Sequence, residues 1–279
     1  MPELPEVEAV ARTLRPLVCG QTIVRCRVIH SIATRPQGPA RLRRSVEGLR
    51  IEGVERRGKY LLLRLSRGFV ALHFRLDGLL VWFDSPKAFS NRPRRAAGGH
   101  IDVAVELRSG TLGFVDRRHF GRVQWLAHVE DSRDIRSLGL DPFSRRFTPE
   151  KLQELLARAR RPVKLLLMDQ TRLAGLGNIY SNEALWRAQL DPRRCAAGLT
   201  PSEARRLHKS VVYVLRRALE CCLHPAPDFR NPDWWFQGLE KMLRVYGRES
   251  RQCRRRCGGR IRRIEQGGRS SYFCPSCQR

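Results

Sequence analysis

Three short apolar runs follow one another between residues 60 and 83: Tyr60-Leu61-Leu62-Leu63-Arg64-Leu65, Phe69-Val70-Ala71-Leu72-His73-Phe74 and Leu79-Leu80-Val81-Trp82-Phe83. Each run is rich in aliphatic and aromatic residues, which is typical of β-strands. Stretches with Gly, Ser and Asp separate them, as expected for turns. A succession of short strands of this kind predicts an antiparallel sandwich or barrel.

The regions on either side complete this organisation. Residues 4–15 place apolar side chains at helical spacing behind an acidic first turn, which predicts a leading helix. Further strands are predicted at 22–28, 101–107, 112–115 and 123–126. From residue 148 the pattern becomes helical, with helices predicted at 149–160, 162–169, 178–188 and 201–222. We predict an α+β multidomain chain with a β-sandwich domain at 1–130, a linker at 131–147, a helical domain at 148–245 and a small terminal domain at 246–279.

The composition indicates a polyanionic partner. The 279 residues include 54 Lys and Arg against 27 Asp and Glu, a formal charge of +27 that is spread along the chain. An excess of this size favours nucleic acid binding. No apolar run approaches the ~18 residues of a transmembrane helix, and the acidic, Pro-containing start is unlike a signal peptide. We therefore expect no membrane association and a cytoplasmic, reducing location, near the nucleoid in a bacterium.

Four cysteines near the end of the chain have the spacing of a zinc site. Cys253, Cys257, Cys274 and Cys277 form the pattern Cys-x3-Cys-x16-Cys-x2-Cys, and the residues between the pairs predict a hairpin that turns at Gln266-Gly267-Gly268. Four thiolates can surround one tetrahedral zinc, which would fold a segment too small for its own core. The alternatives are two disulfides, or a site that Cys253 no longer reaches.

The beginning of the chain, Met1-Pro2-Glu3-Leu4-Pro5-Glu6, combines an amine with acids. Removal of Met1 would leave Pro2 with a free secondary amine, whose reference pKa near ~8 leaves a useful neutral fraction at pH 7. Such an amine can attack the C1′ carbon of a nucleoside and form an iminium, and Glu3 is placed to move a proton. The alternative is an ordinary helix with an acidic first turn.

Several motifs occur together in one order. They are Met-Pro-Glu-Leu-Pro-Glu-Val-Glu at 1–8, Arg-Gly-Lys-Tyr-Leu-Leu-Leu at 57–63, Asp-Arg-Arg-His-Phe-Gly at 116–121, Gly-Leu-Gly-Asn-Ile-Tyr at 175–180, Tyr-Gly-Arg at 246–248 and the terminal cysteines. The series resembles the formamidopyrimidine-DNA glycosylase/endonuclease VIII family of base-excision repair enzymes over essentially the whole chain. The resemblance implies an N-terminal β-sandwich, a helix–two-turn–helix domain and a zinc finger, with DNA held between domains.

The resemblance also implies a role for individual residues. Pro2 would be the nucleophile, Glu3 the proton-transfer partner and Glu6 an ordering residue of the same site. Lys59, Asn178 and Arg269 would bind phosphates near the lesion, and Lys164 would lie near the flipped nucleotide. Leu76, Arg118 and Phe120 would fill the gap that an extruded base leaves in the stack. The four cysteines would bind one structural zinc. The expected partner is double-stranded DNA with damaged bases, and the expected state is a monomer.

The resemblance implies a bifunctional glycosylase and abasic-site lyase that cleaves by β,δ-elimination. Two departures bear on it: His119 stands where the family usually has a second Arg, and residues 228–238 replace the Gly/Ser/Asp-rich loop of members that prefer 8-oxoguanine. The Pro- and Trp-rich 228–238 segment predicts a stiff connector and a preference for formamidopyrimidines or oxidised pyrimidines. The alternatives are an enzyme that prefers 8-oxoguanine, a catalytically silent damaged-DNA-binding protein and an RNA-binding zinc-finger protein.

Overall fold

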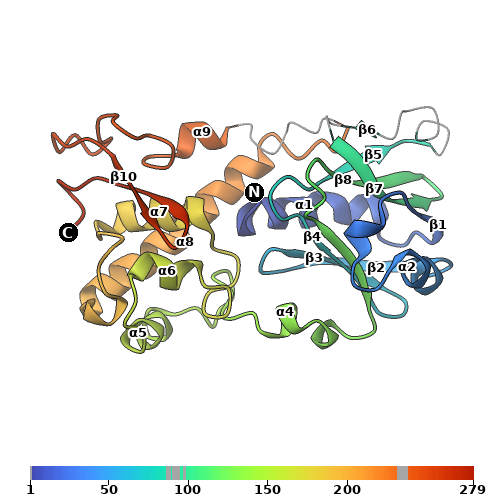
Figure 1. Ribbon diagram of the computed structural model, residues 1–279, viewed down its shortest axis with the longest axis horizontal. Helices are drawn as coiled ribbons and strands as arrows, with labels where there is room; N and C mark the ends of the chain where they lie inside the picture. Colours follow the sequence, from blue (N-terminus) through green and yellow to red (C-terminus); the bar gives the residue numbers. More distant parts are fainter. Residues whose placement is uncertain (1, 86–88, 90–94, 97–98, 231–237) are drawn as a thin grey trace. The chain divides into compact units, whose positions relative to one another are not determined.

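The computed structural model describes residues 2–85, 89, 95–96, 99–230 and 238–279. The chain forms two compact units (Figure 1). The first comprises Met1–Arg136 with Cys222–Gln237, and the second comprises Ser137–Cys221 with Gly238–Arg279. The α+β class predicted from the sequence is confirmed. The domain boundaries at residues 130, 147 and 245 stay predictions.

The leading helix α1, Leu4–Val18, lies against strand β2 of the first unit. Its apolar face, which includes Val7, Val10 and Leu14, is fully buried. Two polar contacts fix its position: Glu8 forms an ion pair with Arg56 of β2 at 2.8 Å, and the guanidinium of Arg15 donates to a β2 carbonyl at 2.7 Å. These contacts hold the start of the chain at a defined place on the sheet.

The first unit is a sandwich of two antiparallel sheets, as the strand pattern predicted (Figure 1). One sheet has the order β1-β7-β8-β5 with β6 paired to β7, and the other has the order β2-β3-β4-β9. The strands are β1 Ile23–Val28, β2 Ile51–Arg57, β3 Tyr60–Leu65, β4 Phe69–His73, β5 Leu79–Phe83, β6 Arg95–Ala96, β7 Gly99–Leu107, β8 Gly110–Asp116 and β9 Arg122–Leu126. All seven predicted strands are present, and β2 and β6 were missed.

Short helices border these sheets. They are η1 Ser31–Thr34, α2 Pro39–Val46, η2 Val129–Asp131 and α4 Arg133–Arg136. Helix α4 lies inside the predicted linker 131–147. The main core between the sheets and α1 includes Phe74, Leu80, Val103 and Phe114, and it also takes in Phe229 from the returning chain.

The second unit is helical, as predicted, and carries a terminal hairpin. Its helices are α5 Pro149–Ala157, α6 Val163–Met168, α7 Asn178–Ala188, η3 Ala196–Gly198, α8 Pro201–Leu223 and α9 Leu239–Met242, where the last residues of α8 return to the first unit. The starts of α5 and α8 are both capped by side chains. The Thr148 hydroxyl accepts from the Lys151 N–H at 3.2 Å, and Glu203 accepts from the Thr200 N–H at 2.8 Å.

Strands β10 Arg262–Gln266 and β11 Arg269–Phe273 form the terminal hairpin. The two residues that connect them, Gly267 and Gly268, have φ values of 57° and 68°. Positive φ at both central positions is the geometry of a tight two-residue hairpin turn, which glycine adopts without strain. The turn predicted at Gln266-Gly267-Gly268 is therefore confirmed.

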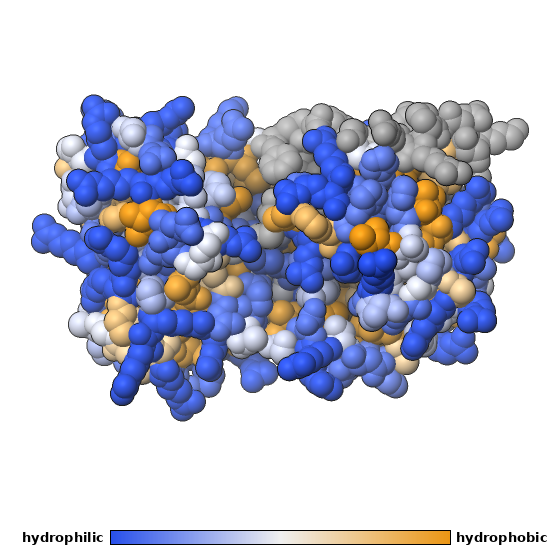
Figure 2. All heavy atoms as spheres, in the orientation of Figure 1, coloured by the Kyte–Doolittle hydropathy of each residue, from blue (hydrophilic) through white to orange (hydrophobic). Residues whose placement is uncertain are grey.

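Hydrophilic residues cover most of the visible face of each unit (Figure 2). This agrees with a chain in which 29% of the residues are charged and Lys and Arg outnumber Asp and Glu two to one. Within the described part of the chain, no helix is both long and apolar enough to cross a membrane.

Candidate functional site

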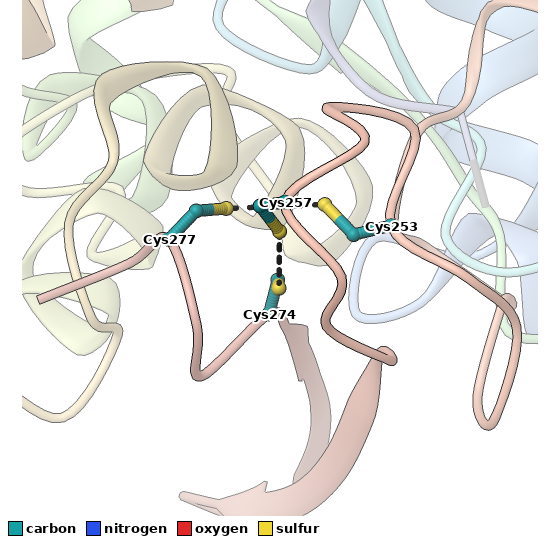
Figure 3. Close-up of side chains that lie close together, drawn as sticks. All are labelled: Cys253, Cys257, Cys274 and Cys277. Atoms are coloured by element: carbon teal, nitrogen blue, oxygen red, sulfur yellow. Dashed lines mark hydrogen bonds between the residues drawn. The ribbon is translucent and has the colours of Figure 1, made fainter.

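Four cysteine side chains from two hooks of the second unit point toward one another (Figure 3). The sulfur atoms of Cys253 and Cys277 are 3.8 Å apart, and those of Cys257 and Cys274 are 3.5 Å apart. A disulfide requires about 2.05 Å, whereas two thiolates on a tetrahedral zinc at about 2.3 Å are separated by about 3.8 Å. The thiols are free, so the two-disulfide alternative is wrong. The extra residue in the first hook does not remove Cys253 from the cluster.

The surroundings of the cysteines suit thiolates bound to a metal. The indole N–H of Trp186 donates to the sulfur of Cys253 at 3.4 Å. A hydrogen bond from the backbone of Gly259 is the main cause that lowers the pKa of Cys257 to about 7. Burial instead raises the pKa of Cys274 and of Cys277. A zinc ion would supply the positive charge that this close group of thiolates needs.

At the start of the chain, Pro2, Glu3 and Glu6 are all buried, with Glu3 1% and Glu6 4% exposed. Glu3 is the N-cap of α1, and its backbone N–H donates to Oε2 of Glu6 at 2.9 Å. This contact orders the first helical turn. It brings two carboxylates next to Pro2 at the positive end of the α1 dipole, as the acidic sequence suggested.

Lys59 lies in the turn between β2 and β3 and is 8% exposed. The turn is tied to α1 through one arginine: Arg56 donates to Glu8 of α1 and also, at 3.1 Å, to the carbonyl of Gly58. Gly58 has a φ of 57°, which favours glycine immediately before the lysine. The chain of contacts from Glu8 to Gly58 therefore positions Lys59 relative to the helix that begins at Pro2.

His73, at the end of β4, was not singled out from the sequence. Its ring packs edge-on against Tyr60 at 4.5 Å, and its Nδ1 accepts from the Arg75 N–H at 3.0 Å. Burial, reinforced by the positive charges of Arg75 and Lys59, lowers the pKa of His73 to about 3. His73 is therefore neutral at physiological pH and adds a hydrogen-bonding ring, not a charge, beside Lys59.

Two loops of the first unit, one with Leu76 and one with Arg118 and Phe120, approach each other. The guanidinium of Arg118 lies 3.5 Å from the carboxylate of Asp77, the neighbour of Leu76, and 4.8 Å from the centre of the Phe120 ring. Phe120 is 47% exposed, so it is not an ordinary core residue. An exposed aromatic ring, an arginine and a half-buried leucine on adjoining loops have the character of a wedge for stacked bases.

The loop 117–121 is held by Asp116, whose role the sequence did not reveal. Its buried carboxylate accepts the Arg118 N–H at 2.9 Å and the Gly121 N–H at 2.6 Å. A Cβ at Gly121 would lie 2.4 Å from the ring of Phe114, so only glycine fits there. The conformation that presents Arg118 and Phe120 is thus fixed at both ends.

In the second unit, Lys164 is fully buried in α6. Its Nζ donates to the carbonyl of Ser270 at 3.0 Å and to the hydroxyl of Ser271 at 2.6 Å. Lys164 therefore positions β11, the strand that begins at the exposed Arg269. In this conformation Lys164 supports the hairpin. A direct contact between Lys164 and a nucleotide stays a prediction.

Asn178 is the first residue of α7, and its buried side-chain oxygen has no hydrogen-bond partner within the described residues. Two further residues of α7, both missed from the sequence, hold segments near it. Asn182 accepts the Tyr272 N–H of β11 at 2.7 Å. Glu183 accepts the N–H groups of residues 244–246, and burial raises its pKa despite these three bonds. Helix α7 thus organises both the hairpin and the Tyr246-Gly247-Arg248 motif.

Three family models match the chain in succession. They are the formamidopyrimidine-DNA glycosylase N-terminal domain at residues 1–123, the H2TH domain of the same enzymes at 138–223, and the zinc finger found in FPG and IleRS at 253–279. A β-sandwich, a helix–two-turn–helix region and a four-cysteine finger in this order define a DNA glycosylase of base-excision repair. The finger carries one structural zinc, as predicted.

Relatives and solved structures agree with these matches. The formamidopyrimidine-DNA glycosylase of Pelotomaculum thermopropionicum is 39% identical over 100% of this chain and 99% of its own length, and that of Streptococcus mutans is 36% identical over 100% of both. The Lactococcus lactis enzyme, solved in complex with DNA that contains an abasic site, has a TM-score of 0.85 at 29% identity, with 99% of each chain covered. The chain belongs to the formamidopyrimidine-DNA glycosylase family and is a bifunctional glycosylase and abasic-site lyase.

Proposed function

We propose that this enzyme binds double-stranded DNA at a damaged base, excises the base and cuts the strand through an iminium formed by Pro2. The observation that carries the proposal is the buried start of α1, where Glu3 and Glu6 adjoin Pro2. DNA with an abasic site or a ring-opened guanine is bound by the Lactococcus lactis relatives of known structure. The combination of a secondary amine with a neighbouring acid suits attack on a sugar carbon.

The proposed reaction assigns a role to each residue at the start of the chain. The amine of Pro2 bonds to C1′ as the bond between C1′ and the base breaks, and the proton that the amine gives up passes to the departing base. Glu3 gives a proton to the sugar ring oxygen, so the ring opens and the iminium forms. Loss of a C2′ proton then expels the 3′ phosphate, and a second elimination expels the 5′ phosphate. Glu6 keeps Glu3 in place through the backbone hydrogen bond at 2.9 Å.

We propose that Lys59, Asn178 and Arg269 contact the phosphates around the lesion. Lys59 is held by the α1-linked turn, and Arg269 is presented by the hairpin that Lys164 and Asn182 support. The amide side chain of Asn178 lies at the positive end of α7, which suits a phosphate. Leu76, Arg118 and Phe120 enter the stack in place of the extruded base.

The affinity for undamaged duplex should fall steeply with salt, because phosphate contacts release counterions. A footprint of ~6–10 phosphates gives a log–log slope of about −5 to −9. Lys59→Ala and Arg269→Ala should each make the slope shallower by about one unit. The measurement is fluorescence anisotropy over a salt series. Lys151→Ala is the matched control, because the Lys151 ammonium already pairs with Glu154 at 2.7 Å and its loss should leave the slope unchanged.

We further propose a preference for ring-opened purines or oxidised pyrimidines over 8-oxoguanine. The support lies at the start of the 228–238 connector. Phe229 is 3% exposed within the sandwich core, its carbonyl accepts the Trp82 N–H at 3.1 Å, and the guanidinium of Arg230 bonds Asp84 at 3.0 Å. These contacts hold residues 229–230 against the sandwich, which limits the freedom of a lid that begins there. Residues 231–237, which include Trp234 and Trp235, lie outside the described residues.

Single-turnover rates should decide the lesion preference. We expect slow excision of 8-oxoguanine opposite cytosine and faster excision of a formamidopyrimidine or thymine glycol. An abasic-site duplex is the control, since its cleavage needs no base recognition and reports the lyase step alone. A clear preference for 8-oxoguanine would contradict the proposed preference, whereas loss of cleavage on the abasic duplex would contradict the proposed reaction itself.

A further inference from the structure

Within the described residues, one group of metal-ligating side chains lies outside the zinc finger: His30, Asp102 and His119 of the first unit. Each offers one ligand atom, and these atoms all lie within 4.8 Å of one another. His30 follows β1, Asp102 belongs to β7, and His119 lies in the 117–121 loop after β8. The group therefore joins two neighbouring strands of one sheet to the loop that carries Arg118 and Phe120.

Asp102 is placed there by an irregularity in the sheet. The register of β7 against β8 shifts between Ile101 and Val103, so Asp102 is the extra residue of a β-bulge. Bulges re-aim single side chains and often occur beside functional sites. The backbone carbonyl of Asp102 also accepts the N–H of Ile29 at 2.8 Å and of His30 at 3.2 Å, which brings the end of β1 to the same place.

The Asp102 carboxylate is fully buried and only partly satisfied. Its Oδ1 lies 2.8 Å from Nδ1 of His119, while its Oδ2 has no hydrogen-bond partner in the described part of the chain. Burying a carboxylate oxygen without a hydrogen-bond partner lowers the stability of the fold, and a bound cation would offset this cost. The neighbouring carboxylate of Asp116 adds negative charge near Asp102.

His119 is held in an uncommon backbone conformation, with a φ of 55°. Few residues other than glycine adopt this region, and they often do so at functional positions. Its ring lies 4.9 Å from the ring of His30 and stacks at 5.2 Å on His100. Two imidazoles and a carboxylate thus converge, with a third imidazole packed beside them.

We propose that His30, Asp102 and His119 form a second metal site, which binds a divalent cation that prefers imidazole, with zinc as the fitting ion. Two imidazoles and one carboxylate, with water in the fourth position, make a common zinc ligand set. Tetrahedral ligands at about 2.0 Å lie about 3.3 Å apart, so the 2.8 Å contact between Asp102 and His119 needs only a small opening. The bound ion would tie the loop of Arg118 and Phe120 to β1 and β7.

The simpler alternative is that His119 serves only as a cationic or hydrogen-bonding partner of Asp102. This alternative accounts for the contact of His119 with Oδ1 of Asp102. It does not explain why Oδ2 of Asp102 lacks a hydrogen-bond partner within the described residues, or why His30 lies close to the same carboxylate. The two readings differ in metal content, which does not depend on the proposed function or on DNA. Cobalt is a suitable probe, because thiolate ligands give a strong charge-transfer band that imidazole and carboxylate ligands lack.

The experiment uses the full chain, loaded with zinc and freed of excess metal by gel filtration. We expect two zinc ions per chain in the wild type, one in His30→Ala and in His119→Arg, and two in His128→Ala, which changes an exposed histidine elsewhere. Arg at 119 places a cation beside Asp102, and an unchanged circular dichroism spectrum and melting temperature would show that this variant folds. Cobalt added to protein with a zinc-filled finger should give visible d–d absorption without a thiolate band, and His119→Arg should remove it. A wild type that binds only one metal, or a second metal that both variants retain, would overturn the proposal.

Discussion

Borohydride reduction is expected to link this enzyme covalently to DNA that contains an abasic site or a damaged base. The expectation follows from the amine of Pro2, which forms a reducible iminium with C1′ and lies beside the buried Glu3. A form that retains Met1 has no free amine at Pro2, so it should give no adduct and no strand cleavage. The measurement is the fraction of protein with reduced mobility on a denaturing gel, compared with N-terminal mass analysis of the same sample.

Two variants separate the nucleophile from the acid. Pro2→Gly keeps a primary amine once Met1 is removed, so some trapping should remain. Glu3→Gln keeps the amine but removes the proton donor, and loss of a general acid typically lowers rates by about 10²–10⁴-fold. Excision of a base by Glu3→Gln should therefore slow by that factor in single-turnover assays. Full trapping by protein with a blocked terminus would show that another amine is the nucleophile.

The strands were predictable where burial on both faces leaves a continuous apolar run. Strands β3 and β5 were predicted with their observed bounds, Tyr60–Leu65 and Leu79–Phe83. Strand β2 was missed because Ile51–Arg57 buries only Ile51 and Val54 and presents polar residues to solvent. Helix α2 was missed for the same reason, since only Leu42 and Val46 of Pro39–Val46 are buried. Apolar periodicity reveals a strand or helix only when enough apolar residues repeat along it. It misses elements such as β2 and α2, which pack against the core through only two buried residues.

The residues of the candidate site also fall into those that a local sequence pattern reveals and those that it does not. The four cysteines were predictable because metal ligation needs one residue type at short spacing within each hook. Glu183 and Asp116 act on backbone N–H groups, and any sequence can supply those donors. No local pattern therefore marks them. His30, Asp102 and His119 lie far apart in the chain, and only the sheet register and the bulge at Asp102 bring them together.

Loss of the finger's zinc is the second large effect that we expect. Cys257→Ser removes one of four thiolates that the structure brings together, and apparent binding energies of structural zinc in finger peptides are about 10–16 kcal/mol at pH 7. The variant should lose one equivalent of zinc relative to the wild type, and residues 251–279 should lose protection from proteolysis. The finger's small apolar cluster of Val245, Cys253, Ile261 and Cys274 includes two of the ligands, so it offers little stability without the metal.

Cys253→Ser tests the first hook, where three residues separate the cysteines. Because Cys253 lies 3.8 Å from Cys277 and receives the Trp186 N–H, its loss should also release zinc, as strongly as the loss of Cys257. Cys195→Ser is the control, since this cysteine is exposed and lies outside the cluster. DNA affinity connects the metal to function: Arg269 sits on the hairpin that the zinc folds, so both finger variants should flatten the salt slope at least as much as Arg269→Ala. Retention of zinc by Cys253→Ser alone would show that three thiolates hold the ion and that Cys253 only packs beside them.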